Sequence, residues 1–297
     1  MEKRKPKARK NHKDSLFCDL FSDPVRALSL YNAINGTAYR DPSDLKIVTI
    51  KDVLLLHQKN DVSILFDAKL TLWEHQSTYN PNMPLRGLLY YASNMEGIIG
   101  DRRRMLYRRS VEKIPAPAYY VFYNGTEEMP ERTDLKLSDA FLVPAEGYEW
   151  TAHMLNINLG RNKILMDHCP ELKGYAELVQ HIRELVANGS VLEDAVDRAI
   201  SQCIEEGILT DYLQKLRGEA MGMLLTEFDE QEWEETIREE SREEGREEGR
   251  EEGEDMLVSL LKRIPRNSSD YEIALNGSRE DRRDLYAKYE VRSGHLV

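Results

Sequence analysis

The stretch "NDVSILFDAKLTLWEHQ", Asn60–Gln76, decides the fold of this chain. It contains two apolar runs of strand length, "DVSILFD" and "AKLTLWEHQ", and a tight bend at Asp67–Ala68 would join them as a β-hairpin. The second run alternates polar and apolar residues and then ends in three polar side chains, Glu74–Gln76. The question raised by this pattern is why a strand should finish in a carboxylate, an imidazole and an amide.

Pleat geometry separates these three side chains. Successive residues of a strand point to opposite faces, so Glu74 and Gln76 share one face and His75 packs or hydrogen-bonds on the other. Asp61 opens the preceding strand, so two carboxylates come from neighbouring strands. Such a pair can share Mg²⁺ or Mn²⁺, which prefer oxygen ligands and leave positions for water and phosphate. A bound ion of this kind activates water and stabilises charge on a phosphodiester.

Sequence patterns on both sides of the hairpin predict a mixed sheet. Apolar residues at helical spacing over 14–34, interrupted by Pro24 and ended by Gly36, predict two short helices in front. The first half of "LKIVTIKDVLLL" reads as a strand, and a long helix is predicted from Leu85 to Arg109. "APAYYVFYNGT" and "HMLNINLG" read as further strands. We therefore expect the α/β class.

The C-terminal half is predicted to be helical. Three amphipathic segments follow Cys169, and then "REEGREEGREEG" repeats a tetrapeptide that favours a solvated, partly frayed helix or linker. The last 44 residues resemble a small helical tail. We predict a basic N-terminal segment at residues 1–13 and a sheet domain at 14–165. A helical region at 166–228, an acidic segment at 229–255 and the helical tail at 256–297 follow.

Composition excludes several classes of protein. The 297 residues are 41% hydrophobic, enough for one large or two ordinary domains with a core. No apolar run is long enough to predict a membrane span, and the basic N-terminus is followed by no signal-peptide core. The three cysteines are scattered without a CxxC pair, which predicts buried or incidental thiols rather than disulfides or zinc. We expect a cytoplasmic protein.

The charge of the chain is distributed unevenly. Residues 227–255 hold 16 acids and 4 arginines, which accounts for the whole net charge of −12. Bases cluster elsewhere: residues 1–13 carry seven Lys or Arg against one Glu. Grouped bases make DNA a candidate partner despite the acidic total, although a solvated helix face is the alternative. The second cluster comprises Arg102, Arg103, Arg104, Arg108 and Arg109.

Four stretches of this chain resemble a known family. "HKDSLF", "NDVSILF", "EHQSTYNPNMPLRGLLYY" and "PAYYVFYNGT" are similar to the Rpn family of recombination-promoting nucleases, often labelled transposases, in the PD-(D/E)XK superfamily. The resemblance covers about residues 12–160, and the acidic "EEG" repeats are also in the style of this family. It implies a restriction-endonuclease-like core, a mixed sheet with flanking helices, followed by an all-helical extension. The implied activity is Mg²⁺-dependent DNA cleavage linked to recombination or mobile elements.

The resemblance also assigns roles to particular residues. Asp61 and Glu74 match the metal-binding acids of the second and third motifs, and Asp14 matches the first acidic position. Gln76 stands where the superfamily has Lys, and Asn60 where its name expects Pro. A Lys can stabilise charge and help to deprotonate water, whereas Gln only orients through hydrogen bonds. Gln at this position is normal for this branch of the superfamily, so the predicted catalytic set includes Gln76.

The same residues and segments also fit other roles. Asp14 can instead be the N-cap of the helix that follows it. Arg86 can orient Glu74, touch a phosphate, or form a plain structural salt bridge. The chain as a whole can be a nuclease-like scaffold that binds DNA or a protein without cutting. The helices of residues 170–260 can also serve as a homo-oligomerisation module.

Overall fold

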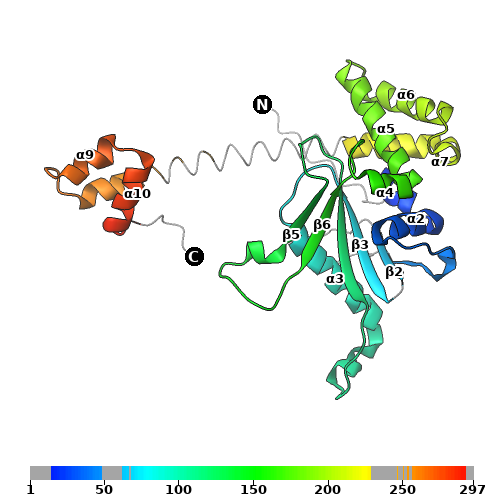
Figure 1. Ribbon diagram of the computed structural model, residues 1–297, viewed down its shortest axis with the longest axis horizontal. Coiled ribbons are helices and arrows are strands. Elements are labelled where there is room, and N and C mark those ends of the chain that lie inside the picture. The colour runs from blue at the N-terminus through cyan, green and yellow to red at the C-terminus, as the bar shows by residue number, and fades with distance from the viewer. Residues whose placement is uncertain are drawn as a thin grey trace, which may run out of the picture. The chain divides into compact units, whose positions relative to one another are not determined.

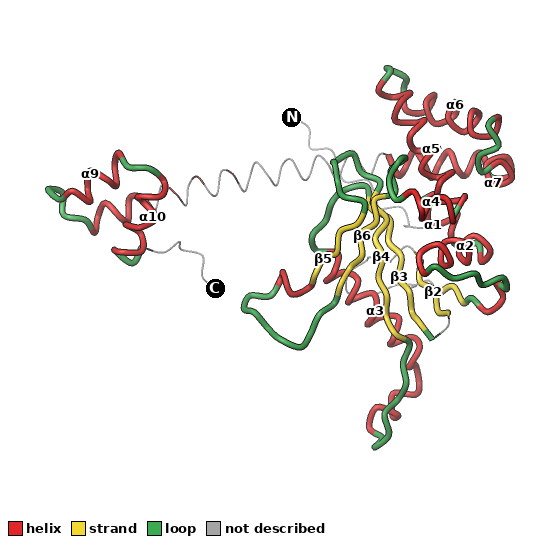
Figure 2. Tube along the Cα trace, viewed as in Figure 1, coloured by secondary structure: helices red, strands yellow, loops and turns green. Residues whose placement is uncertain are grey.

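The computed structural model describes residues 15–48, 62–66, 68–228, 246, 250, 253 and 256–291. Contacts divide the chain into two units, Met1–Gln231 and Glu232–Val297. The first unit contains a mixed sheet with helices on both faces, so the predicted α/β class is confirmed (Figures 1 and 2). Among the described residues, no helix combines the length and apolar character that crossing a bilayer requires.

The sheet has six strands in the order β1-β2-β3-β4-β6-β5. β3 pairs antiparallel with β2 and parallel with β4, β4 pairs parallel with β6, and both edge strands are antiparallel to their neighbours. The predicted hairpin is confirmed, because Phe66 pairs with Lys69 across a two-residue bend that contains Ala68 at φ 56°. The strands are β1 Lys46–Val48, β2 Val62–Phe66, β3 Lys69–Gln76, β4 Ala116–Tyr123, β5 Arg132–Lys136 and β6 Thr151–Asn156.

Two helices precede the sheet, as predicted. α1 (Leu16–Phe21) is capped by Ser15, whose hydroxyl accepts from a backbone N–H in the first turn. α2 (Pro24–Asn35) has its proline in the first turn and ends at Gly36, which adopts φ 64°. Ser15 therefore performs the capping role that was considered for Asp14, and that alternative was wrong.

α3 (Met83–Ile99) covers the face formed by Leu70 and Leu72. It approaches the sheet closely at Gly87, where an added Cβ would lie 2.3 Å from the ring of Tyr119. The helix was predicted to run to Arg109, and this was wrong. Gly100 leaves the helical conformation at φ 48° and ψ −130°, and the chain continues as the 3-10 helix η2 (Gly100–Tyr107).

The opposite face is covered by α1, α2 and the helical region. Trp73 of β3 and Phe122 of β4 share one core with α1, α2, α5 and α6, and with the helical residues 217–228. The helix predicted across 210–228 is interrupted at Leu216, which has φ −119°. All three cysteines are buried, as expected. The helices are α4 Lys163–His168, α5 Pro170–Ala187, α6 Leu192–Glu205 and α7 Thr210–Lys215.

The second unit is a small helical cluster, which agrees with the predicted tail. Residues 256–263 are helical, followed by α9 (Ser269–Asn276) and α10 (Arg279–Lys288). A capping box between Ser278 and Asp281 begins α10. The basic N-terminal segment and most of the acidic segment lie outside the described residues. The predicted domain boundaries stay predictions. The core of the unit comprises Leu260, Ile264, Ala274, Leu285 and Val291.

Candidate functional site

The last residues of β3 divide between the two faces of the sheet. Leu70 and Leu72 pack in the core beneath α3, whereas Trp73 packs in the core of the other face. Glu74 and Gln76 continue the α3 face, and the Nε2 of Gln76 donates to Oε1 of Glu74 over 3.4 Å. The prediction that Glu74 and Gln76 share a face is confirmed by this contact.

Glu74 is a buried carboxylate with a cation against it. Its side chain is 2% exposed, and that of Arg86, in the first turn of α3, is 23% exposed. The Nη2 of Arg86 donates to Oε1 of Glu74 over 2.5 Å. The hydroxyl of Tyr90, one helical turn further, accepts from Nε and Nη2 of Arg86 at 3.3 and 3.1 Å. Arg86 therefore fixes one oxygen of Glu74 through a charge-assisted hydrogen bond.

The electrostatics of Arg86 follow from this contact. Burial acts to lower the pKa of Arg86, but the Glu74 carboxylate and the Tyr90 hydroxyl outweigh it, and the pKa lies above its ordinary value. Arg86 stays protonated and supplies the positive charge that a buried carboxylate requires. Of the roles considered for Arg86, contact with Glu74 is present, and contact with a phosphate stays a prediction.

Two of the three predicted metal ligands, Asp61 and Asp14, lie outside the described residues. The register of the hairpin is nevertheless known. Val62, which follows Asp61 in the chain, pairs with Trp73, which precedes Glu74. The start of β2 therefore lies beside the end of β3 that carries Glu74.

The oxygen donors at this strand end suit a hard cation. Glu74 offers a carboxylate and Gln76 an amide, and ligands of these kinds fit Mg²⁺ or Mn²⁺. Within the described residues, no three His, Cys, Asp or Glu side chains gather closely enough to hold a metal ion. The described donors thus fit part of a magnesium site, and Asp61 and Asp14 are its further ligands by prediction.

The arginines predicted to contact DNA fall at the two ends of α3. Arg86 lies in the first turn against Glu74, whereas the cluster at residues 102–109 follows the last turn. The 17 residues of α3 correspond to about 25 Å along the helix axis. The structure therefore brings Arg86, but not the cluster, to the candidate centre. Within the cluster, Arg104, Arg108 and Arg109 are exposed, and the side chains of Arg102 and Arg103 lie outside the described part.

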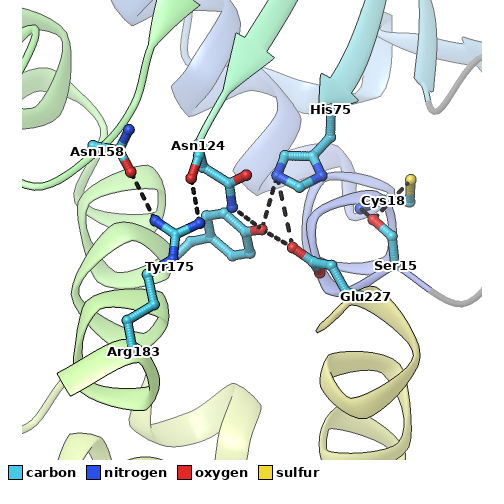
Figure 3. A network of polar contacts seen from close by, with 8 residues as sticks. All are labelled: Ser15, Cys18, His75, Asn124, Asn158, Tyr175, Arg183 and Glu227. Atoms are coloured by element: carbon cyan, nitrogen blue, oxygen red, sulfur yellow. Dashed lines mark hydrogen bonds and ion pairs between the residues drawn. The ribbon is translucent and has the colours of Figure 1, made fainter. Parts of the chain in front are cut away.

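A buried polar network lies on the opposite face of the sheet (Figure 3). The hydroxyl of Tyr175 is 2.9 Å from Nε2 of His75 and donates to Oε1 of Glu227. The ring of His75 stacks on Phe17 with centroids 5.2 Å apart, and Asn124 donates to the Tyr175 hydroxyl over 3.1 Å. His75 therefore packs and hydrogen-bonds away from the Glu74 face, as predicted.

Arg183 of α5 extends this network to the turn after β4. Its Nη1 donates to Oδ1 of Asn158 over 2.9 Å, and its Nη2 donates to the backbone carbonyl of Asn124. The same turn approaches the end of β3 so closely that a Cβ at Gly125 would lie 2.0 Å from the carbonyl oxygen of Ser77. The ends of β3 and β4 are thus held by a close backbone approach and by an arginine from the helical region.

Glu227 is a titratable group at the centre of the network. Complete burial raises its pKa to about 7, against the lowering effects of Tyr175, the Leu16 backbone N–H, Arg183 and Asn124. Burial first, and Glu227 second, raises the pKa of Tyr175 well above its usual value. Glu227 therefore changes charge near neutral pH, while Tyr175 stays protonated.

The sequence reasoning missed Glu227, Tyr175 and Arg183. Glu227 opens a run of acids, and a tyrosine or arginine in an amphipathic helix reads as core or surface. A signal was present, because Glu227 follows the buried Leu224 by three residues and Ala220 by seven. That spacing places a carboxylate on an apolar helix stripe, where a charged residue requires partners.

A second cluster has the residue types of a nucleophilic triad. Sγ of Cys203 is 3.6 Å from Nδ1 of His181, and Nε2 of His181 is 4.0 Å from a Glu206 carboxylate oxygen. Burial, with Glu206 and Glu177 adding to it, raises the pKa of the Cys203 thiol to about 12. Because the thiolate is the nucleophile, this cluster is unsuited to covalent catalysis.

A pocket of about 200 Å³ adjoins the first turn of α3. Pro84 and Leu85, the two residues before Arg86, form part of its wall, and Tyr79 and Lys136 also line it. The pocket supplies a concave, mostly apolar surface beside the turn that carries Arg86.

Comparisons with protein-family models, with curated proteins and with solved structures found no match.

Proposed function

We propose that this protein is a metal-dependent DNA endonuclease of the Rpn type, which hydrolyses phosphodiester bonds of DNA. We link this activity to recombination or to mobile elements. One observation carries the proposal. Glu74, Gln76 and Arg86 converge at one strand end of a mixed sheet, beside the start of the strand that Asp61 precedes. A buried acid at a strand end, with a second acid one strand away, is the arrangement that the resemblance leads us to expect.

Each residue has a distinct role in this proposal. Asp61, Glu74 and Asp14 would hold Mg²⁺ or Mn²⁺. When bound, the ion would supply a water of lowered pKa and positive charge for the phosphate. Gln76 orients the attacking water by hydrogen bonds, because an amide is a poor proton acceptor. Arg86 fixes the orientation of the Glu74 carboxylate and keeps a positive charge beside the substrate phosphate.

A second candidate is a nuclease-like scaffold that binds DNA or a protein without cutting. The contact between Arg86 and Glu74 favours it, because the guanidinium already occupies one oxygen of the predicted ligand. The amide at Gln76 favours it too, since it lacks the charge of the lysine usual in the superfamily. The endonuclease breaks DNA, whereas the scaffold leaves DNA intact.

Plasmid cleavage in Mg²⁺ and in Mn²⁺ distinguishes the candidates. We expect nicked or linear product from the wild type, and a rate lower by on the order of 100-fold or more for Asp61→Ala and for Glu74→Gln. Asp134→Ala is the matched control, because this acid lies on the edge strand β5 and pairs with His153 at 2.8 Å. It should cut at the wild-type rate.

Gln76→Lys tests the role of the amide directly. Lysine adds a charge that stabilises the transition state, so we expect faster cleavage than in the wild type. If wild type and Gln76→Lys both leave DNA intact in every metal while still shifting it on a gel, the endonuclease proposal fails and the scaffold candidate stands.

A further inference from the structure

The segment that follows α3 projects beyond the ends of the neighbouring strands before the chain returns to β4 (Figures 1 and 2). We call residues 104–114 the arm. Four of its apolar side chains are unusually accessible: Tyr107 is 90% exposed and Val111 84%, and Leu106 and Ile114 are also exposed. Apolar residues gathered on a projecting segment mark an interaction surface.

The arm is also basic. It carries Arg104, Arg108, Arg109 and Lys113 against one acid, Glu112. All four basic side chains are exposed. Among the described residues, no salt bridge joins them to an acid. The arm therefore presents a positive charge that the described part of the fold leaves uncompensated.

These charges select among possible partners. A symmetric contact between two copies would place the same patch on both subunits, so four bases would face four bases at short range. A polyanion removes this repulsion and releases counterions on binding. The arm carries one aromatic residue, Tyr107, rather than the several stacking residues of a single-strand platform. Basic residues interspersed with apolar ones instead match proteins that hold a duplex backbone and press apolar side chains into a groove.

We propose that the arm is a second, metal-independent contact for double-stranded DNA, remote from the candidate centre. The inference rests on the proposed function for its partner. Arg104, Arg108, Arg109 and Lys113 contact phosphates, and Leu106 and Tyr107 lie against a groove. Arg86 and Gly100 are separated by about 20 Å of helix, or about six base pairs of duplex. The arm thus anchors DNA well away from the phosphate to be cut.

Fluorescence anisotropy with a labelled 30-base-pair duplex tests the arm in the full chain. EDTA is present throughout, so the measurement does not depend on cleavage. For Arg108→Ala with Arg109→Ala, we expect affinity to fall on the order of tenfold at moderate salt, and the slope of log affinity against log salt to decrease by about two. For Leu106→Ala with Tyr107→Ala, affinity should fall several-fold with the slope unchanged, because these side chains release no counterions.

The matched control removes two exposed bases elsewhere. Lys262→Ala with Arg266→Ala subtracts the same charge from the second unit and should leave both affinity and slope close to wild type. All variants should keep the wild-type melting temperature, since the arm is exposed. The proposal is overturned if the arm variants bind duplex as the control does. It is also overturned if they alter only the oligomeric state, or only binding to anionic phosphatidylserine vesicles. If the wild type does not cleave DNA but the arm variants still lose duplex affinity, the endonuclease proposal fails and the proposal for the arm stands.

Discussion

The ion pair between Arg86 and Glu74 fixes the candidate centre at the scale of single residues. Removal of the Arg86 guanidinium leaves a carboxylate that is 2% exposed without this cation. We expect Arg86→Ala to lower the free energy of unfolding by about 3–5 kcal/mol, measured by urea denaturation at pH 7. Arg217→Ala is the control, because its pair with Asp197 is 2.6 Å long but exposed, and such pairs contribute about 0–1 kcal/mol. Equal losses in the two variants would contradict a buried, structurally required pair.

The absence of a side chain at Gly87 allows α3 to pack closely on the sheet. An added Cβ would meet the buried ring of Tyr119 at 2.3 Å, so Gly87→Ala should destabilise the protein by about 1–3 kcal/mol through overpacking. Gly97→Ala, in the same helix, meets nothing within 4 Å and should instead stabilise it by up to about 1 kcal/mol. Thermal unfolding of both variants checks this prediction. A loss at Gly97 as large as that at Gly87 would show that the contact with the Tyr119 ring is not the cause of the loss at Gly87.

Among the polar contacts of the helical residues 217–228, Glu227 lies 3.7 Å from His75 of β3 and is titratable. Glu227 has a pKa of about 7 in the folded protein against an ordinary value of 4.5. The folded state therefore binds its proton more tightly than the unfolded state, and the contribution to stability is fully present below pH 4.5. It is lost as pH rises through 7, by about 3 kcal/mol in total. The groups that face this carboxyl are His75, Tyr175, Arg183, Asn124 and the backbone N–H of Leu16.

Glu227→Gln isolates this titration. The amide stays neutral, so the variant should lose the decline of unfolding free energy between pH 5 and pH 8 and exceed the wild type in stability at pH 8. Denaturant unfolding of both proteins across this range measures the difference, and other titrating groups cancel in it. Parallel curves for the two proteins would mean that Glu227 does not titrate near neutrality.

At the scale of the whole molecule, the helical region belongs to the core of the first unit. Leu172 and Ile182 of α5 share that core with Phe17, Trp73 and Phe122. A chain truncated after residue 165 loses α5 and exposes this apolar face, so we expect it to aggregate or to lack cooperative unfolding. A chain truncated after residue 231 keeps the whole core and should unfold cooperatively near the wild-type temperature. Light scattering and near-ultraviolet circular dichroism compare the two truncations, and a well-folded 1–165 chain would refute this view.

Much of the fold was predictable because it depends on neighbours in the chain. Local backbone preferences predict the hairpin around Ala68 and the two helices divided at Pro24. They also predict that Glu74 and Gln76 lie on the same face of the sheet. The errors have physical causes. The helix end at Gly100 depends on a backbone conformation that the apolar stripe does not encode. The short strand β5 was not predicted, because it carries more charged than apolar residues. It forms a strand by pairing with β6.

The candidate site was predictable only on one face of the sheet. The sequence by itself determined the strand that ends in Glu74, His75 and Gln76 and the face on which each lies, because pleating is a local property of the backbone. Only the tertiary structure decided that Arg86 fixes Glu74, and that Glu227 accepts from Tyr175 and lies 3.7 Å from His75. These partners are 12 to 152 residues apart in the chain. Their contacts arise from the packing of helices on both sheet faces, which no local pattern specifies.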